Sequence, residues 1–320
     1  MGANLTEFAE KLFSNHSARF FRKEKTAFLE CCKEEFKRLG YSDDEIMVQR
    51  SRVSQNLVVG APNAEYLFTA HYDTPGRNGW MLFLSPLVGQ VLANIILSVL
   101  LVVIVVFAML NLAGDTTLYM LRVIAVVSFV ALLVSTIWKN KNNYNDNTSG
   151  VFGVMRIAAL VADDAELRKK CAFVMFDNEE WGLLGSNAFA KWRKKNYAGC
   201  ENNKVINLDC IGNGDVLLVA ATKQNELLND VTKHFNNDGF DVQKKKSELI
   251  FLSDHASFEC SVGIFSLKRS MFGSLYIPKI HSRRDKVCDI HSIERLTNSI
   301  FGYIKNLIEN KSNEGSNTNV

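Results

Sequence analysis

The sequence lacks the cysteine patterns of a disulfide framework or a structural zinc site. Its seven cysteines include no CxxC pair, their number is odd, and two of them, Cys31 and Cys32, are adjacent. Disulfide-rich domains typically carry an even number of spaced cysteines, and structural zinc sites need paired Cys or His ligands. The pattern therefore indicates structural thiols in a reducing compartment.

Prolines and excess charge are also scarce. Four prolines among 320 residues leave no Pro-rich linker, and a net charge of +3 does not indicate a nucleic-acid partner. The residues through Lys11 are polar and charged, without the apolar segment of a signal peptide. No internal repeat is found. With 47% apolar residues, the chain can bury a full-sized core, in one large domain or two modest ones.

Charged residues are absent from residues 81–110. As a helix, residues 87–110 would be about 36 Å long, enough to cross a hydrocarbon core of about 30 Å. A polar link at 111–117 leads to a second apolar run at 118–138. A pair of buried core helices is the alternative, but soluble helices keep a polar face. The pattern therefore predicts an inserted transmembrane helical hairpin over residues 78–138.

The charges flanking this hairpin predict its orientation. Arg77 precedes it, Lys139 and Lys141 follow it, and the link carries no Lys or Arg. The positive-inside rule then places the rest of the chain in the cytoplasm. Residues 81–138 would contact the lipid bilayer. A homo-oligomer could form through small residues of the hairpin, namely Gly89, Ala93 and Ser98.

The remaining sequence alternates short apolar runs with amphipathic segments. The expected strands are 46–53, 57–59, 66–70, 171–176, 204–208, 216–220 and 263–267. The expected helices are two within 5–39 and single ones at 151–161, 186–195, 225–235 and 290–307. This alternation predicts an α/β fold, a three-layer sandwich with a central sheet between helices. The polar residues 311–320 are expected to form a disordered tail.

Polar side chains suited to metal binding follow the ends of several expected strands. Singly they have ordinary explanations, such as a helix N-cap for Asp146 or a surface carboxylate for Glu180. Ligands collect at the carboxyl ends of strands in α/β sheets, so their joint occurrence favours a site. Histidines and carboxylates without thiolates suit a catalytic zinc or a similar divalent ion. The candidates are His71, Asp73, Asp146, Glu179, Glu180, Asp209 and His281.

These residues lie in motifs that resemble peptidase family M28, a family of zinc peptidases. The motifs stand in order at 71–73, 146–150, 176–186, 209, 253–255 and 280–285, and the resemblance covers roughly 1–75 and 140–310. It implies one peptidase domain, formed by 1–77 and 139–310, with a mixed β-sheet between helices. The hairpin interrupts this domain where simpler members of the family have a short loop.

The resemblance also implies roles for the candidate residues. Asp146 would bridge two divalent metal ions, expected to be Zn²⁺, and a cis peptide bond would follow it. His71 and Asp209 would hold one ion, and Glu180 and His281 the other. Glu179 would be the general base, and Asp73 would orient the ring of His71. Asp254 and His255 are expected to line the substrate side.

The function expected from this resemblance is a membrane-anchored di-zinc metallopeptidase, an aminopeptidase acting on small or membrane-associated peptides. Because both ends of the insertion lie close to proposed ligands, the hairpin is expected to restrict access to the site. One alternative is an acyl transferase similar to glutaminyl cyclases, which would use one metal. A second is a membrane scaffold without catalytic activity. The complete ligand set and Glu179 disfavour both.

Overall fold

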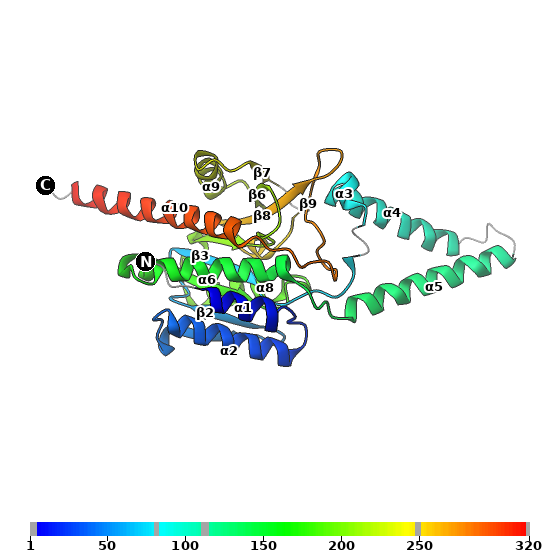
Figure 1. Cartoon of the computed structure of the whole chain (residues 1–320), viewed down its shortest axis with the longest axis horizontal. Helices are drawn as coiled ribbons and strands as arrows, with labels where there is room; N and C mark the ends of the chain where they lie inside the picture. The colour runs from blue at the N-terminus through cyan, green and yellow to red at the C-terminus, as the bar shows by residue number, and fades with distance from the viewer. Residues whose placement is uncertain (1–4, 80–82, 110–114, 247–250, 318–320) are drawn as a thin grey trace.

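A computed structural model describes residues 5–79, 83–109, 115–246 and 251–317 of the chain (Figure 1). Nine strands among these residues form one sheet in the order β1-β2-β4-β3-β5-β8-β6-β7, with β9 paired to β8. The strands are β1 (Ile46–Arg50), β2 (Gln55–Val59), β3 (Tyr66–His71), β4 (Cys171–Phe176), β5 (Lys204–Leu208), β6 (Val216–Ala221), β7 (Val242–Lys246), β8 (Ser261–Arg269) and β9 (Leu275–Tyr276).

The sheet is mixed. Strands β4, β3, β5 and β8 run parallel to their neighbours in the centre, whereas β2 pairs antiparallel with β4 and β6 antiparallel with β8. The carboxyl ends of β3, β4 and β5 therefore meet at one edge of the sheet. This arrangement places the residues that follow these three strands close to one another.

Helices cover both faces of the sheet (Figure 1). Alternate strand residues, such as Phe68 and Phe173, face the larger core together with residues from α1, α2, α6, α9 and α10. Their neighbours in sequence, such as Leu67 and Val174, face α8 in a smaller core. The bounds are α1 (Thr6–Asn15), α2 (Arg22–Arg38), α6 (Gly150–Val161), α7 (Ala165–Lys170), α8 (Leu184–Asn196), α9 (Glu226–Asn237) and α10 (Ile290–Asn317).

This architecture confirms the predicted α/β fold with a mixed central sheet between helices. Strands β4 and β5 have the predicted bounds. Helix α7 and strands β7 and β9 were not predicted from the sequence; each is six residues or shorter. Helix α10 continues to Asn317, into the segment expected to be a disordered tail, and residues 318–320 lie outside the described residues.

The prediction of a transmembrane hairpin is wrong. Helices α3 (Ser85–Val88), α4 (Gln90–Met109) and α5 (Asp115–Ile137) occupy this part of the chain, but no helix of the described residues is both long and apolar enough to span a membrane. The prediction assumed one continuous helix over residues 87–110. Instead the chain breaks at Gly89, whose φ of 87° lies in the left-handed region. Polar residues at Asp115 and Arg122 interrupt the apolar character of α5.

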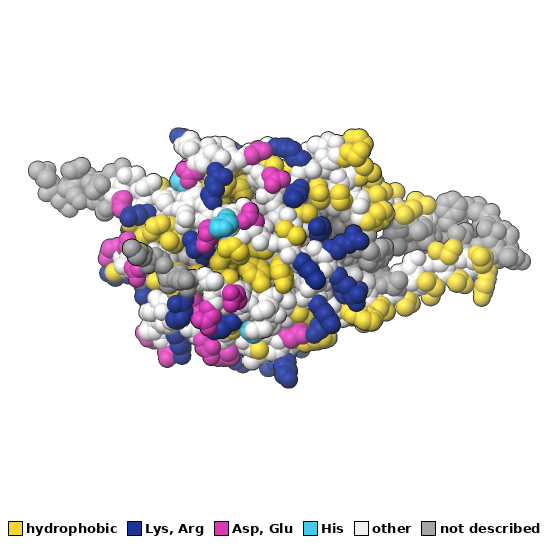
Figure 2. Space-filling model, in the orientation of Figure 1, with side chains coloured by type: hydrophobic (Ala, Val, Ile, Leu, Met, Phe, Trp, Pro, Cys, Tyr) yellow, Lys and Arg dark blue, Asp and Glu magenta, His cyan; other side chains and the backbone are white. Residues whose placement is uncertain are grey.

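The cytoplasmic placement and the bilayer contact of 81–138 depended on that hairpin, so both predictions fall with it. Part of the predicted link lies at 110–114, outside the described residues. Helices α4 and α5 pack along each other and extend away from the sheet (Figure 1). Apolar side chains line their outer surfaces, with Val99 57% and Val126 63% exposed (Figure 2).

Candidate metal centre

The edge formed by β3, β4 and β5 carries a cluster of histidines and carboxylates. His71 is the last residue of β3, Asp209 directly follows β5, and both are buried. Glu179 and Glu180 lie half-buried in the turn between β4 and α8. Two further residues of the cluster lie outside the sheet. Asp146 lies in the segment before α6, and His281 lies in the loop after β9.

Asp146 lies between the two histidines. Its Oδ1 is 3.4 Å from Nε2 of His71, and its Oδ2 is 3.1 Å from Nε2 of His281. Asp209 Oδ1 is 3.6 Å from the same nitrogen of His71, and Glu180 Oε2 is 3.4 Å from that of His281. Two sets of three residues in the cluster therefore share Asp146, with one carboxylate oxygen facing each set; a third set is formed by His71, Glu179 and Glu180.

These spacings suit metal coordination. Two ligand atoms each 2.0–2.1 Å from one tetrahedral zinc ion are about 3.3 Å apart, which matches the distances around Asp146. In each set, one ligand atom per residue lies within 4.8 Å of the others. Oε1 of Glu180 is buried without a hydrogen-bond partner, as a group awaiting a cation would be. The donor set thus fits two divalent ions.

The backbone around Asp146 is held by two side chains. Asp285 is buried and accepts hydrogen bonds from the amides of Asn145 and Asp146, at 2.9 and 3.1 Å. The Asn147 side chain donates to the carbonyl of Leu208 at 3.0 Å, which ties the segment to the end of β5. The Asp146–Asn147 peptide bond is cis, as the resemblance implied. Asp285 was not singled out from the sequence, although it closes the motif at 280–285.

Asp73 acts on the turn that carries the two glutamates. Its carboxylate accepts hydrogen bonds from the amides of Glu179 and Glu180, at 2.9 and 3.2 Å. The predicted contact with the His71 ring is longer, at 3.6 Å from Nδ1, and the backbone carbonyl of Asp73 lies nearer, at 3.2 Å. The main contacts of this carboxylate are therefore to the glutamate turn rather than to the imidazole.

Replacing Asp73 by Asn is expected to loosen this turn. An amide offers one acceptor oxygen in place of two and turns an N–H donor toward a backbone amide, so one partly buried N–H loses its partner. The expected cost is about 1–3 kcal/mol of folding stability, with a lower kcat because the Glu179 side chain is held less firmly. Urea unfolding and steady-state kinetics measure both effects, and an unchanged unfolding midpoint would contradict the contact.

A buried arginine lies beneath the cluster and was missed in the sequence. Arg19 is fully buried between α1 and α2, and its backbone amide donates to Thr74 Oγ1 at 2.9 Å. Its guanidinium donates to Thr148 Oγ1 at 2.9 Å and to the carbonyl of Tyr72. Burial lowers the pKa of Arg19 to about 10, although nearby groups, including Asp73 and Asp146, act to raise it. The residue thus links the N-terminal segment to both sides of the site.

Negative charge is concentrated in the cluster. Burial raises the pKa of Glu180 well above its ordinary value, and the Asp146 carboxylate adds to this rise. Burial alone would lower the pKa of His71, but Glu179 and the surrounding aspartates raise it well above its ordinary value. Carboxylates this close repel one another unless protons or cations lie between them. Divalent cations would relieve that repulsion.

Asp254 and His255 lie in a short helical turn (Asp254–Ser257) and are both buried. Burial raises the pKa of Asp254 to about 7, and its charge acts on Glu179, which places it near the cluster. Burial lowers the pKa of His255 to about 4, so its ring is neutral. Whether the two line the substrate side stays a prediction.

A cavity of about 530 Å³ opens beside His281. The start of the insertion forms one wall, and the Gly79 amide donates to the carbonyl of His281 at 2.8 Å. Among the described residues, the cavity lining has four cationic side chains and no acidic one: Arg77, Lys279, Arg283 and Arg284. Lys and Arg side chains also gather on the surface where α4 and α5 leave the body of the protein (Figure 2).

Comparisons with known proteins agree with this geometry. A profile of peptidase family M28 matches residues 135–301, which is more than half of the chain, and the chain belongs to that family. A search of curated proteins gave no match.

Solved structures with the same fold include the LapA aminopeptidase of Legionella pneumophila, at a TM-score of 0.60 and 14% identity, covering 95% of this chain and 71% of that one. They also include the glutaminyl cyclase of Porphyromonas gingivalis, at a TM-score of 0.63 and 15% identity, covering 94% and 96%. At these identities the likeness shows the fold alone.

Proposed function

We propose that this protein is a di-zinc metallopeptidase of the aminopeptidase type, acting on small peptides. The observation that carries the proposal is the position of Asp146, whose two oxygens face two separate histidine–carboxylate pairs. Membership of a peptidase family supports the reaction class, and a fold shared with an aminopeptidase is consistent with it.

In the proposed mechanism, Asp146 would hold both ions, His71 and Asp209 would hold one, and Glu180 and His281 the other. Two bound divalent ions would lower the pKa of a water molecule and polarise the substrate carbonyl. Glu179 accepts the proton of the attacking water and returns it to the leaving amine. Asp73 keeps Glu179 in place through the backbone, because it accepts hydrogen bonds from the amides of both glutamates.

Peptide digestion with and without a chelator tests this proposal. Purified protein is incubated with a library of short peptides, and the products are identified by mass spectrometry. We expect residues to be released from the amino end, and the activity to disappear with chelator and return with Zn²⁺. Activity that is insensitive to the chelator, or no cleavage of any peptide by zinc-loaded protein, would contradict the proposal.

A cyclase reaction is the second candidate, because a glutaminyl cyclase shares the fold. Peptides with an N-terminal glutamine separate the two reactions: hydrolysis releases free glutamine and a peptide shorter by one residue, whereas cyclisation keeps the chain length and loses ammonia. We expect hydrolysis, because His281 lies as close to Asp146 (3.1 Å) as His71 does (3.4 Å), and Glu180 lies 3.4 Å from His281. A one-metal reaction would need only one of the two pairs.

The cationic cavity beside His281 is expected to favour substrates with acidic side chains. Replacing Arg283 and Arg284 by Gln should lower the kcat/KM of a Glu-containing peptide about 30-fold relative to its Gln isostere, since each of the two partly solvated charges contributes on the order of 1 kcal/mol. Lys23→Gln/Lys195→Gln removes the same charge at exposed sites outside the cavity and should leave the ratio unchanged. An equal ratio in all three proteins would contradict this preference.

The insertion is proposed to limit which peptides enter. Phe83, Ser85 and Pro86 from its first part line the same cavity as His281, so large or folded substrates would meet this wall. Oligomerisation through α4 and α5 stays a prediction.

A further inference from the structure

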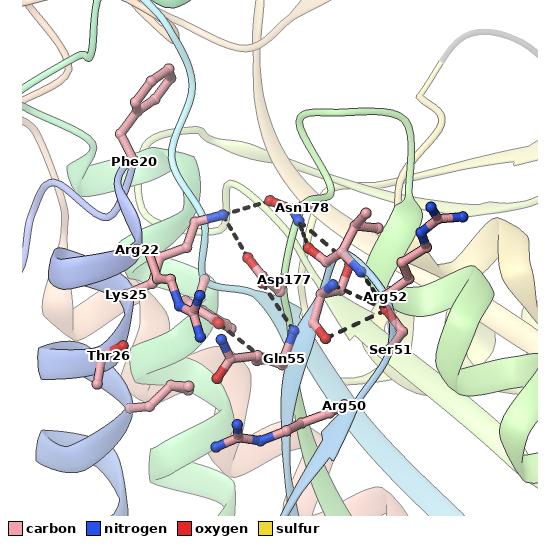
Figure 3. A pocket seen from close by; sticks show the side chains of 14 residues that line it. Phe20, Arg22, Lys25, Thr26, Arg50, Ser51, Arg52, Gln55, Asp177 and Asn178 are labelled. Atoms are coloured by element: carbon pink, nitrogen blue, oxygen red, sulfur yellow. Dashed lines mark hydrogen bonds and ion pairs between the residues drawn. The ribbon is translucent and has the colours of Figure 1, made fainter.

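A second cavity lies behind the turn that carries the two glutamates (Figure 3). It has a volume of about 360 Å³, within the size range of small-molecule sites. One wall is the start of α2, with Arg22 and Thr26, and the opposite wall is the end of β1, at Arg50, with the connection to β2. Asp177 and Asn178 form the floor (Figure 3).

Positive charge dominates this cavity. In the part of the chain that the structure describes, its lining has four cationic side chains, Arg22, Lys25, Arg50 and Arg52, and one acidic side chain, Asp177. Lys25 already pairs with Asp177, at 2.6 Å, and also donates to Asn178 at 2.5 Å. Among the residues that the structure describes, no acid lies within ion-pair distance of Arg22 or Arg50. The single carboxylate therefore already has a partner, whereas Arg22, Arg50 and Arg52 have no acidic partner among the described residues.

The side chains that face the cavity differ in their freedom. Lys25 and Asp177 are fixed by their mutual contact, with 12% and 6% of their side chains exposed. Arg22 and Arg50 are exposed at the rim, and in Figure 3 they lie on the same side of the Lys25–Asp177 pair. A planar guanidinium offers two parallel N–H donors to the oxygens of a phosphate or carboxylate. Two such groups around one hollow suit an anion with several oxygens.

We propose that this cavity binds a phosphate group carried by a small soluble molecule. Arg22 and Arg50 would hold the phosphate oxygens, and the Thr26 hydroxyl could donate a further hydrogen bond. A dianion compensates the charges of Arg22 and Arg50, whereas a monoanion would leave one of them uncompensated; Arg52 adds a further positive charge to the lining. The remaining volume would take the organic part of the molecule.

The cavity lies next to the turn that carries Glu179 and Glu180, so a bound ligand could affect the active site. Asn178, on the cavity floor, directly precedes Glu179 and adopts a left-handed conformation, with φ of 57°. Its side chain donates to the carbonyl of Val53 in the β1–β2 connection at 2.6 Å. The same turn is held from the opposite side by Asp73. A ligand in the cavity would thus lie against the segment that positions both glutamates.

Calorimetric titration of the full-length, metal-loaded protein with inorganic phosphate tests the site. We expect the Arg22→Gln/Arg50→Gln variant to bind at least tenfold more weakly than the unmodified protein, and each single variant at least threefold more weakly. The matched control, Lys23→Gln/Lys195→Gln, removes two exposed positive charges outside the cavity and should keep its Kd within twofold. Thermal melting of every variant verifies that it is folded.

Competing anions define the ligand class. Sulfate should displace phosphate, because it has the same shape and charge, and succinate should bind more weakly. The proposal is overturned if phosphate does not bind, if its Kd is the same with and without the two arginines, or if the control variant loses as much affinity. Tighter binding of succinate than of phosphate would also overturn it, by showing a dicarboxylate site. Phosphate bound only at the metal centre would appear as a Kd unaffected by the arginine changes.

Discussion

Glu179→Gln is expected to abolish nearly all turnover while the protein keeps its metal ions. Loss of a general base typically costs about 10²–10⁴-fold in rate, and a neutral amide cannot accept the proton of the attacking water. Glu179 is not needed for either of the two residue sets that share Asp146, so metal content should stay at two ions per chain. Steady-state kinetics and elemental analysis by mass spectrometry measure the two quantities on the same sample.

The metal content distinguishes a general base from a metal ligand. Glu179 also lies within ligand distance of His71 and Glu180. If Glu179 were a metal ligand, the Glu179→Gln variant would contain less metal than the unmodified protein. Glu34→Gln, on the exposed face of α2, makes the same chemical change far from the cluster and should behave like the unmodified protein. Full activity in the Glu179 variant would rule out its role as the base.

Asp146→Asn is expected to have the second large effect, on metal binding itself. The amide keeps the size of the side chain but loses the charge and one of the two oxygens that face the histidines. Substitution of outer groups that orient ligands typically lowers metal affinity by about 10–100-fold, and loss of the shared ligand should exceed that. We expect one ion or fewer per chain, and activity below detection.

Two comparisons separate this effect from misfolding. Asp163→Asn, at an exposed position just after α6, should retain two ions and full activity. The metal-free Asp146 variant should melt close to the metal-free parent, because the change also removes one of several mutually repelling carboxylates. Two ions per chain in Asp146→Asn would contradict the bridging role.

The sequence was most informative where local pattern alone sets the structure. The apolar runs that form β4 and β5 have no competing interpretation, and the polar residues after them necessarily meet at one edge once the strands are parallel. That reasoning placed His71, Asp209 and the glutamates correctly at the same edge. It could not give their roles, which depend on distances of a few tenths of an ångström.

Contacts between segments that are distant in the sequence could not be predicted from the sequence alone. Nothing local marks Arg19 as a buried residue, since its burial arises from partners at Tyr72, Thr74 and Thr148. Asp285 was missed for a similar reason: it accepts hydrogen bonds from two backbone amides that lie 139 and 140 residues away in the sequence. The transmembrane hairpin was predicted because residues 81–110 carry no charge. In the structure this segment is not one helix, because the chain breaks at Gly89.

The buried Arg19 has a practical consequence for choosing fragments of this protein. A fragment limited to the family-matched residues 135–301 would lack Arg19 and the whole of β3. Because β3 lies between β4 and β5, its removal would leave a gap in the middle of the sheet. The fragment would also have one of the two clustered histidines. Any shortened version intended for biochemistry should therefore begin upstream of α1, even though homology alone suggests a much later start.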